Sequence, residues 1–297
     1  MPARVAVVVN PAAGRGRALH LIPTVRGLLK SLGVEYSIEV SSAPDQPEKL
    51  ARRAAEDGVG IVAALGGDGL AGMVSNGLMS SKAGLAVIPA GTGNDLARSL
   101  GLDRKDPLSA VRMLADPKTR PMDVLQVTSG RSRRYCLNVA GAGFDSEVNE
   151  TANAMRTRLK GSAKYVAALL RTLRRFEPAD FELVVDGKEI RRRAMLIAIG
   201  NGRSYGGGMR VCPDASLFDG SVDVCIVGEM SKGEFLGAFP KVFRGTHVKH
   251  AKVTMLRGKE IELRADRRLM VYGDGEPAGP LPASFLVLPA ALPVVVP

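Results

Sequence analysis

The sequence predicts an α/β protein with two domains: an N-terminal α/β domain built on a parallel sheet, and a C-terminal domain that is mainly β and sandwich-like. Two observations predict it. Strand, loop and helix patterns alternate over residues 1–122, which is typical of a parallel sheet with crossover helices. From about residue 123, short extended segments separated by turn residues replace this alternation, which is typical of a β-rich domain. We therefore expect domains at 1–122 and 123–288.

The strands expected in the first domain are short runs at residues 5–9, 36–40, 61–65 and 84–88, and helices are expected at 18–32, 48–57, 70–79 and 95–100. We interpret the start of the chain as a buried strand rather than a signal peptide, because its apolar run has only five residues. In such a sheet, ligand sites lie at the carboxyl ends of the strands.

The loop Gly66-Gly67-Asp68-Gly69 follows the run Ile61–Leu65 directly. Glycines let a backbone lie close to a ligand, and the N–H groups at the start of the following helix attract phosphate. The carboxylate of Asp68 would repel phosphates unless a cation such as Mg²⁺ lay between them. The loop therefore indicates a metal-assisted nucleotide site, although Gly and Asp are also the commonest residues of ordinary turns.

A second loop of this kind, Pro89 to Asp95, follows the fourth expected strand. Because each loop carries one aspartate at the end of its strand, we expect Asp68 and Asp95 to converge on one phosphate and metal site. The loop after the first strand does not match the dinucleotide-binding fingerprint, since Leu19 stands where that pattern requires glycine.

In the second domain we expect strands at 124–128, 134–139, 180–185, 193–199, 221–227, 252–256, 260–264, 270–271 and 284–288. A helical stretch at 146–176 interrupts them. It places apolar residues between basic ones, namely Arg156, Arg158, Lys160, Lys164, Arg171, Arg174 and Arg175. Such a segment can lie on anionic lipid, which attracts each basic residue by roughly 1 kcal/mol, or it can be the solvated face of a buried helix.

Composition limits the partners. Residues 126–297 contain 26 Lys and Arg against 18 Asp and Glu, so an anionic partner is expected, either phosphates or a membrane surface. With no Trp and 4% aromatic residues, stacking platforms are scarce, and no nucleic acid is expected. Three scattered cysteines indicate a reducing, cytoplasmic setting. We interpret His247 and His250 as part of a solvated basic face, because no third metal ligand is adjacent.

Seven motif blocks, in this order, resemble the diacylglycerol kinase catalytic-domain family, the bacterial lipid kinases related to sphingosine kinases. The blocks are Asn10-Pro11-x-x-Gly14, Gly66-Gly67-Asp68-Gly69, Pro89-x-Gly91-Thr92-Gly93-Asn94-Asp95-x-Ala97-Arg98, Asn138-x-x-Gly141-x-Gly143-Phe144-Asp145, Gly200-Asn201-Gly202 with Gly206-Gly207-Gly208, Pro213-x-Ala215-x3-Asp219-Gly220-x-Val222-Asp223, and Asp274-Gly275-Glu276.

The resemblance implies an α/β domain of the kind shared with NAD kinases and 6-phosphofructokinases, a C-terminal β-sandwich, a nucleotide site in the cleft, and a return of residues 289–297 to the first domain. It implies Glu276 as the general base that takes the proton of the lipid hydroxyl, in a catalytic set with Asp68 and Asp95. A structural Mg²⁺ is implied at the Asp219 carboxylate and the carbonyls of Ser216 and Ser221. The positions implied for ATP binding are Asn10, Ser41, Gly66, Gly67, Asp68, Gly69, Leu70, Ala71, Gly72 and Thr92.

This chain departs from the family pattern at Leu70, where threonine usually follows Gly-Gly-Asp-Gly, and at Ala13, which replaces a frequent serine. A threonine at position 70 could cap the helix or bond a phosphate oxygen, and losing a helix cap typically costs about 1 kcal/mol.

The leading hypothesis is an ATP- and Mg²⁺-dependent lipid kinase that phosphorylates diacylglycerol at an anionic membrane surface from the cytoplasm, with a homodimer as one assembly to consider. A second hypothesis is an NAD kinase, which shares the Gly-Gly-Asp-Gly loop. A third is a nucleotide- or membrane-binding protein that has lost catalysis, which the substitution at Leu70 and the basic surface suggest.

Overall fold

The computed structural model describes residues 4–155, 157 and 162–297, and the chain divides into two compact units. The first unit comprises Met1–Val124, Leu217–Gly220 and Leu288–Pro297, and the second comprises Leu125–Ser216 and Ser221–Val287. Both units are therefore assembled from segments that are distant in sequence. Among the described helices, none is long and apolar enough to cross a membrane.

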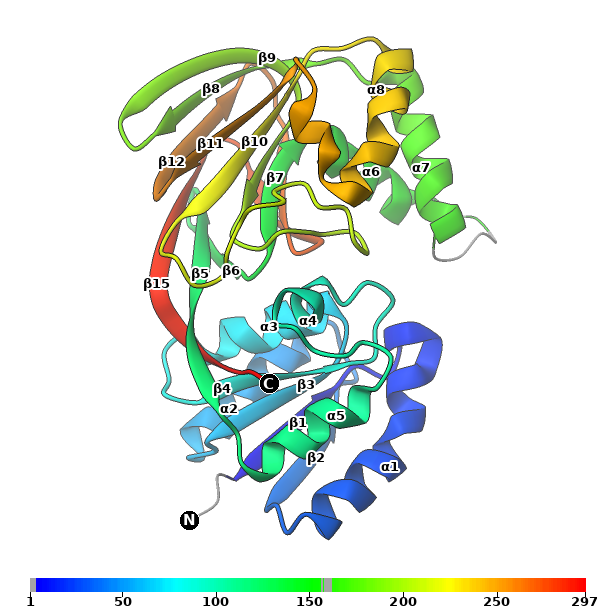
Figure 1. The fold of residues 1–297 in the computed structure, drawn as a ribbon, viewed down its shortest axis with the longest axis vertical. Helices are drawn as coiled ribbons and strands as arrows, with labels where there is room; N and C mark the ends of the chain where they lie inside the picture. The colour runs from blue at the N-terminus through cyan, green and yellow to red at the C-terminus, as the bar shows by residue number, and fades with distance from the viewer. Residues whose placement is uncertain (1–3, 156, 158–161) are drawn as a thin grey trace. The chain divides into compact units, whose positions relative to one another are not determined.

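The first unit is built on a parallel sheet with the strand order β15-β4-β3-β1-β2, in which β1, β2, β3, β4 and the last part of β15 are all parallel (Figure 1). The strands are β1 (Val5–Val9), β2 (Tyr36–Val40), β3 (Ile61–Gly66), β4 (Gly84–Pro89) and β15 (Ala283–Val295). From β1 the chain runs to β2 on one side of β1, and from β2 it returns to β3 on the other side. The order of the strands therefore reverses between β1 and β3. Ligands of open α/β sheets bind at such a point, outside the carboxyl ends of the strands.

Helices cover both faces of this sheet. They are α1 (Arg17–Ser31), α2 (Gln46–Glu56), α3 (Asp68–Leu78), α4 (Asp95–Ser99) and α5 (Pro107–Arg112), with short 3₁₀ turns η1 (Ala13–Gly16) and η2 (Met113–Ala115). On one face, Leu29 of α1 and Val111 of α5 are buried in one cluster with Val7 and Leu65 of the strands. The helices α2 and α3 pack closely because Gly77 of α3 has no side chain: a Cβ there would lie 2.4 Å from the carbonyl oxygen of Glu48.

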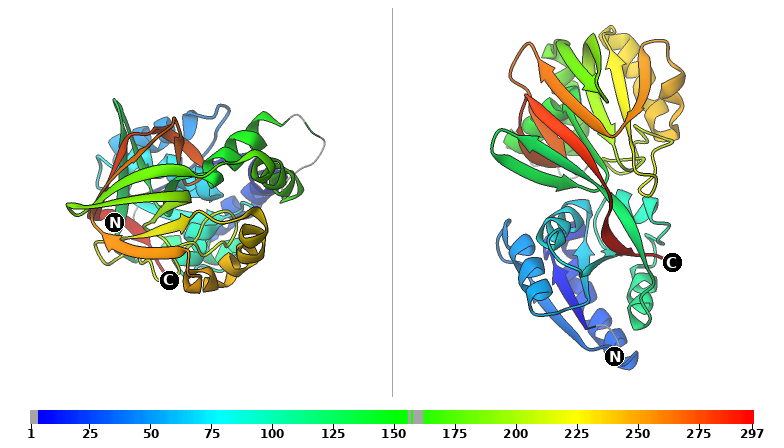
Figure 2. Two further views of the ribbon diagram at one scale, coloured as in Figure 1. Left: turned by 90° about the horizontal axis from the view of Figure 1, so that it is seen from above. Right: turned by 90° about the vertical axis from the view of Figure 1, so that its left-hand side faces the viewer.

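The second unit consists mainly of antiparallel strands around a buried core (Figure 2). The long strand β9 pairs with β8 along its first half and with β7 along its second half, while β10 pairs with the other edge of that second half. The strands are β5 (Thr119–Ser129), β6 (Ser132–Cys136), β7 (Val139–Gly143), β8 (Ala179–Val185), β9 (Lys188–Gly200), β10 (Val222–Gly228), β11 (Val253–Gly258), β12 (Glu260–Ala265), β13 (Met270–Gly273), β14 (Glu276–Pro280) and the first part of β15.

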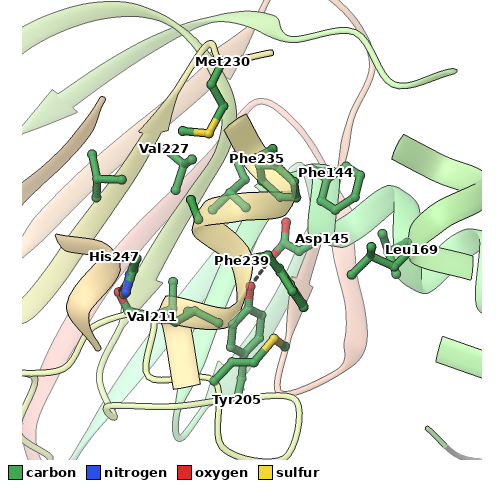
Figure 3. A pocket seen from close by; sticks show the side chains of 16 residues that line it. Phe144, Asp145, Leu169, Tyr205, Val211, Val227, Met230, Phe235, Phe239 and His247 are labelled. Atoms are coloured by element: carbon green, nitrogen blue, oxygen red, sulfur yellow. Dashed lines mark hydrogen bonds between the residues drawn. The ribbon is translucent and has the colours of Figure 1, made fainter. Parts of the chain in front are cut away.

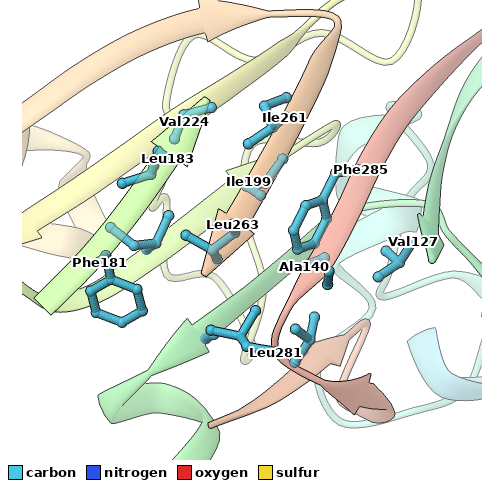
Figure 4. Packing of buried hydrophobic residues seen from close by; sticks show 14 of the residues in the cluster. Val127, Ala140, Phe181, Leu183, Ile199, Val224, Ile261, Leu263, Leu281 and Phe285 are labelled. Atoms are coloured by element: carbon cyan, nitrogen blue, oxygen red, sulfur yellow. The ribbon is translucent and has the colours of Figure 1, made fainter. Parts of the chain in front are cut away.

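Two separate hydrophobic cores flank the central strands of this unit. Inward-facing side chains of the sandwich, such as Phe181, Ile199, Val224 and Phe285, form the first core (Figure 4). The opposite faces of β7, β9 and β10 are covered by helices, which gives the second core. These helices are α6 (Phe144–Ala154), α7 (Ser162–Arg175), α8 (Lys232–Ala238) and the 3₁₀ turns η3 (Phe239–Arg244) and η4 (Thr246–Lys249).

Several local predictions were wrong. The helical stretch expected at 146–176 is two helices, α6 and α7, and three of its basic residues (Arg156, Arg158 and Lys160) lie outside the described residues. The strand expected at 134–139 is divided between β6 and β7. The strand β15 continues past Pro289 and Pro293 into the first unit, where it pairs with β4 and where the N–H of Val296 is donated to the carbonyl of Lys118, just before β5. The helices α8, η3 and η4 were not expected.

Candidate active site

Three loops of the first unit meet through glycines at the carboxyl ends of β1, β3 and β4. A Cβ on Gly91 would lie 2.4 Å from the Cα of Gly67, and a Cβ on Gly14 would lie 2.1 Å from the carbonyl oxygen of Ala90. Backbone therefore contacts backbone at this edge of the sheet, with no room for side chains. Such a glycine-lined edge beside the start of a helix leaves N–H groups accessible to a phosphate.

Hydrogen bonds fix the two longer loops to each other. The carbonyl oxygen of Gly66 accepts the N–H groups of Ala90 (2.8 Å) and Gly91 (2.9 Å). The Asn94 side chain closes its own loop: its Oδ1 accepts the Gly91 N–H (3.0 Å), and its Nδ2 donates to the Gly91 carbonyl (2.9 Å). Asn94 has a positive φ of 54°, which asparagine tolerates better than most residues. The loops are thus held rigidly before any ligand binds.

Asp68 and Asp95 belong to the same loop cluster, because the Asp68 side chain is bonded to the backbone next to Asp95. The Oδ1 of Asp68 accepts the N–H of Leu96 (2.9 Å) in the first turn of α4, so this carboxylate bridges the two loops. Burial raises the pKa of Asp68, and hydrogen bonds from backbone N–H groups, that of Leu96 foremost, oppose this rise. Asp95 is almost fully buried and lies 3.5 Å from Nε of Arg98. Asp68 therefore holds the loops together in addition to any role toward a cation.

The other residues expected to bind ATP end four neighbouring strands of the same sheet. Asn10 follows β1, and its Oδ1 accepts the N–H of Ala12 (3.0 Å) in a local turn. Ser41 follows β2 and is buried, with its hydroxyl donated to the carbonyl of Val9 (3.0 Å). Thr92 is exposed in the loop after β4. The residues from Gly66 to Gly72 end β3 and form the first turns of α3.

Leu70 does not project into the loop cluster. Its side chain is 2% exposed, and a Cβ on Gly66 would lie 2.6 Å from its Cδ2. The leucine thus packs back onto the end of β3 and contributes to the core. Its backbone N–H remains in the first turn of α3, where a phosphate would be bound by main-chain groups whatever the side chain.

Glu276 is the first residue of β14 in the second unit, directly after a two-residue hairpin loop formed by Asp274 and Gly275. Both loop residues have positive φ, 51° and 88°, as a type I′ turn requires. Although Glu276 is an exposed residue, desolvation of its carboxyl group raises its pKa, and the positive charge of Arg134 opposes this rise. A raised pKa moves a carboxylate toward the range useful for a general base.

The carboxylate of Asp274 anchors this hairpin. Its oxygens accept three consecutive backbone N–H groups, those of Leu137 (2.6 Å), Asn138 (2.9 Å) and Val139 (3.3 Å). The loop that contains Asn138 is also bonded to the loop after β9, because the carbonyl of Asn138 accepts the N–H groups of Asn201 (2.8 Å) and Gly202 (2.7 Å). Three motif blocks that are far apart in sequence therefore form one hydrogen-bonded cluster that fixes the position of Glu276.

The residues implied for a structural Mg²⁺ surround a short segment of the first unit. Asp219 is exposed within Leu217–Gly220, and Ser216 and Ser221 flank this segment in the chain. Within the first unit the buried carboxylate of Asp123 accepts the N–H groups of Gly220 (2.7 Å) and Ala290 (2.8 Å), which orders the turn. Among the described residues, no group of three or more His, Cys, Asp or Glu side chains is placed to hold a metal ion. The implied set contains one carboxylate and two carbonyls, a donor set that suits a hard cation.

A cavity lies in the second unit, under the helices of its second core (Figure 3). It has a volume of about 630 Å³, which includes solvent at its mouth, and most of its lining is apolar. The walls come from α6, α7, α8 and η3 on one side, and from β9, β10 and β11 on the other. Of the lining residues, three carry oxygen or nitrogen in their side chains: Asp145, Tyr205 and His247.

The Asp145 carboxylate is buried at this cavity and bonded on both oxygens. Its Oδ1 accepts the N–H of Ser146 (2.9 Å), and its Oδ2 accepts the hydroxyl of Tyr205 (3.3 Å; Figure 3). Burial raises the pKa of Asp145 to about 6, against an ordinary value of 3.8, and the two hydrogen bonds offset part of the rise. The group is therefore ionised at neutral pH and becomes neutral in mild acid.

This shift predicts how stability depends on pH. Because the folded protein holds the proton of Asp145 more tightly than the unfolded chain does, the contribution of this residue is most favourable below pH 4 and is lost as the pH rises through about 6. We expect Asp145→Asn to lose less stability than the wild type between pH 4 and pH 7, by about 2 kcal/mol. Urea unfolding at the two pH values measures this, with the exposed Asp214→Asn as control. Equal pH dependence of Asp145→Asn and wild type would contradict the prediction.

Sequence reasoning missed several of these residues. Asp274 and Asp145 were noted only as members of the motif blocks. The sequence signals that could have singled them out are the glycine that follows Asp274 and the position of Asp145 at the start of a helix. His247 was wrongly interpreted as part of a solvated face, since it is 5% exposed. It lies within a basic run of the sequence, and nothing in that run distinguishes a buried histidine from a solvated one.

Comparisons with known proteins agree with this architecture. The model of the diacylglycerol kinase catalytic domain matches residues 4–127, and that of the YegS C-terminal NAD kinase beta sandwich-like domain matches residues 138–296. A diacylglycerol kinase of Mycobacterium tuberculosis is 36% identical over 296 residues, covering 99% of this chain and 95% of the relative. The diacylglycerol kinase of Bacillus subtilis is 29% identical over 296 residues, covering 99% and 96%.

A crystal structure of a diacylglycerol kinase from Bacillus anthracis superposes with a TM-score of 0.76 at 21% sequence identity, covering 99% of this chain and 97% of that one. This likeness shows a shared fold. The motif blocks, the two matched domain models and the 36% identity together show that the chain belongs to the diacylglycerol kinase family of lipid kinases.

Proposed function

We propose that this protein is an ATP-dependent lipid kinase that transfers the γ-phosphoryl group of ATP to the hydroxyl of diacylglycerol and so forms phosphatidic acid. The observation that carries the choice of a lipid acceptor is the apolar cavity of the second unit. Its apolar walls suit an acyl chain rather than a dinucleotide.

The glycine-lined loops of the first unit would bind the phosphates of ATP. Their fit is supported by two close backbone contacts, Gly14 with Ala90 and Gly67 with Gly91, which a Cβ on any of these three glycines would obstruct. The N–H groups at the start of α3 would bind phosphate oxygens, while Asn10, Ser41 and Thr92 line the same edge of the sheet. Phosphoryl transfer depends mainly on such positioning and on charge neutralisation.

Glu276 would act as the general base. Its carboxylate takes the proton of the lipid hydroxyl as the oxygen attacks the γ-phosphorus. The bond between that phosphorus and the bridging oxygen breaks, and ADP leaves with the electron pair. A positioned base typically contributes about 10²–10⁴ to the rate. Because the Asp274 cluster fixes the hairpin, Glu276 would be held in place before the lipid arrives.

Magnesium would accompany the nucleotide and neutralise charge on the transferred phosphoryl group. We place a second, structural Mg²⁺ at the carboxylate of Asp219 with the carbonyls of Ser216 and Ser221. The Oγ of Ser221 accepts a hydrogen bond from Nε of Arg257 (2.6 Å), which places a guanidinium group beside this proposed site.

A labelled-phosphate assay tests the proposal. Purified protein with Mg²⁺ and labelled ATP is offered diacylglycerol, a sphingoid base, phosphatidylglycerol and a polyprenol. We expect label on diacylglycerol, and a turnover lower by about 10²–10⁴ in Glu276→Gln, with nucleotide binding unchanged because Glu276 belongs to the other unit from the glycine loops.

Each other outcome has a defined meaning. Absence of label on every lipid would overturn the proposal, and formation of NADP from NAD would indicate an NAD kinase instead. Nucleotide binding without any turnover would indicate a homologue that has lost catalysis.

The protein would reach its substrate by docking on an anionic membrane. The helix α7 buries Leu169 and Leu173 but exposes Val166 and Leu170, each 53% exposed and one turn apart. Exposed arginines follow on the same helix, at positions 171, 174 and 175. Leu236 of α8 and Phe243 of η3 are also exposed. Apolar side chains beside basic ones are typical of helices that lie in the interface of anionic bilayers.

Vesicle sedimentation measures this docking. On vesicles that contain phosphatidylglycerol, we expect Leu170→Asp to weaken binding by about tenfold or more, since it removes an inserted side chain and adds a repelled charge. The control is Leu19→Asp, which changes an exposed leucine of α1 in the other unit. Equal loss in both variants, or no loss in Leu170→Asp, would exclude α7 as the docking helix.

A further inference from the structure

The segment 203–210 forms a small hairpin that makes one wall of the cavity. The N–H of Tyr205 is donated to the carbonyl of Met209 (3.2 Å), and the N–H of Met209 to the carbonyl of Tyr205 (3.0 Å). These two bonds form an isolated antiparallel bridge outside the named strands. The side chains of Tyr205 and Met209 both line the cavity. The hairpin, which we call the 203–210 flap, therefore covers this side of the cavity without being a strand of the sandwich.

Three consecutive glycines, 206–208, form the tip of the flap, and all have positive φ (60°, 85° and 115°). Glycine adopts and leaves such conformations at little steric cost, so the tip can absorb a change of backbone angles. The two ends of the flap are fixed. The N–H of Arg210 is donated to the carbonyl of Val242 (2.9 Å), and Nε of Arg203 to the carbonyl of Ala215 (3.1 Å). Fixed ends and a pliable tip are what a lid requires.

The cavity is closed to an acyl chain in this conformation. Its interior has about 60 Å³ of room for water-sized molecules. Small-molecule sites in proteins have volumes of about 300–1,000 Å³. A ligand of the proposed class can therefore enter only if part of the wall moves.

The helical walls of the cavity are tied together by aromatic packing. Phe144 of α6 packs edge-on against Phe176, which follows α7 (5.2 Å between ring centroids), and against Phe235 of α8 (4.8 Å). All three rings are buried. Moving one of these helices would separate the rings and expose them to water, whereas moving the flap displaces two cavity-lining side chains, of which that of Tyr205 is already partly exposed. The flap is therefore the part of the wall that can move most easily.

The hydroxyl of Tyr205 connects the flap to the helical side of the cavity. It donates to Oδ2 of Asp145 at the start of α6 (3.3 Å; Figure 3). The bond thus joins a pliable segment to a fixed helix, which is where a latch can act. We propose that the 203–210 flap is a lid that opens to admit the lipid chain, and that the bond between Tyr205 and Asp145 is its latch. The inference rests on the proposed lipid kinase activity for the class of ligand, and it adds the moving part that controls access.

Hydrogen exchange in the intact protein tests the latch without any ligand. The amides of residues 205 and 209 are bonded in the bridge, so they exchange when the flap opens. Tyr205→Phe removes the hydroxyl and keeps the ring. We expect it to raise both exchange rates by about tenfold, because a hydrogen bond to a charged group is lost, and to leave the ladder between β9 and β10 unchanged. The control is Tyr36→Phe, which removes a hydroxyl from β2 in the other unit.

Ligand uptake tests whether the flap controls access. Stopped-flow fluorescence measures how fast the protein takes up a pyrene-labelled diacylglycerol from detergent micelles. We expect the wild-type rate to level off at high ligand concentration, because opening limits entry, and Tyr205→Phe to raise that limiting rate severalfold. Asp145→Ala should act in the same way, and the double variant should add little to either, because both changes remove one bond.

The outcomes separate the lid from the catalytic proposal. Unchanged exchange at residues 205 and 209 in both single variants, or exchange raised equally throughout β9 and β10, would overturn the inference. Faster exchange without faster uptake, or no uptake by the wild type, would overturn it as well, since the flap would then not admit the lipid. Uptake that depends on the latch, without phosphoryl transfer to any lipid, would overturn the proposed function and leave this inference standing.

Discussion

Gly91→Ala is expected to lower the free energy of unfolding of the first unit by about 3 kcal/mol and to weaken ATP binding by about tenfold or more. The new Cβ would lie 2.4 Å from the Cα of Gly67 and 2.9 Å from Oδ1 of Asn94. Both neighbours belong to the cluster that holds the two loops together, and backbone cannot rotate away as a flexible side chain can. The loops must therefore separate, which moves the N–H groups that would bind phosphate.

Urea unfolding and titration with a fluorescent ATP analogue measure the two effects. The matched control is Gly27→Ala, in the exposed part of α1, where a Cβ meets no atom within 4 Å. That change should leave ATP binding unchanged and stabilise the helix by about 1 kcal/mol. If Gly91→Ala behaves like Gly27→Ala, the close packing of the loops has no role in nucleotide binding.

Asp274→Ala is expected to have the largest effect on turnover apart from changes to Glu276 itself. It leaves three consecutive N–H groups, at residues 137–139, without their acceptor, and it frees the hairpin that carries Glu276. A displacement of about 1 Å at a reacting group can cost 10²-fold in rate, so we expect kcat to fall by about that factor or more. ATP affinity should stay unchanged, because the nucleotide loops belong to the other unit.

The chain provides a close control for this experiment. Asp186 and Gly187 form a second two-residue loop with positive φ, between β8 and β9, and Oδ1 of Asp186 accepts the N–H groups of Lys259 and Glu260 at 2.9 Å each. Asp186→Ala should cost a similar amount of stability and leave kcat intact. Asp274→Asn, which keeps the size of the side chain, should recover part of the loss. Equal loss of kcat in the two alanine variants would mean that Asp274 affects turnover only through the overall stability of the fold.

The sequence was sufficient to predict the elements that position the nucleotide loops. Each of the strands β1 to β4 is a short run, and Asn10, Gly66 and Pro89 stand where β1, β3 and β4 end, so these residues fixed the boundaries closely. Prediction was poorer where tertiary contacts decide the conformation. The segments that became α8, η3 and η4 carry apolar residues that bury only against a sheet formed by distant strands, and this packing leaves no period in the sequence.

The same limit applied to the residues of the site. Asp68 was predicted to be a functional carboxylate, but its hydrogen bond to the N–H of Leu96 depends on how two loops meet, which spacing does not encode. Asp274 stands in an Asp-Gly turn whether or not its carboxylate binds a neighbouring loop. Burial of His247 likewise depends on the approach of η4 to β10, and a run rich in lysine gives no sign of it.

The discontinuous course of the first unit has a consequence for synthesis. Its sheet needs β15, which contains nearly the last residues of the chain, and the buried Asp123 needs the N–H groups of Gly220 and Ala290. On the ribosome, the N-terminal strands therefore emerge long before β15 and these hydrogen-bond donors exist. The second unit, whose segments end at Val287, completes its sequence first. The first unit should thus reach its native state only after β15 has been synthesised, and no single cut can yield it as an independent fragment.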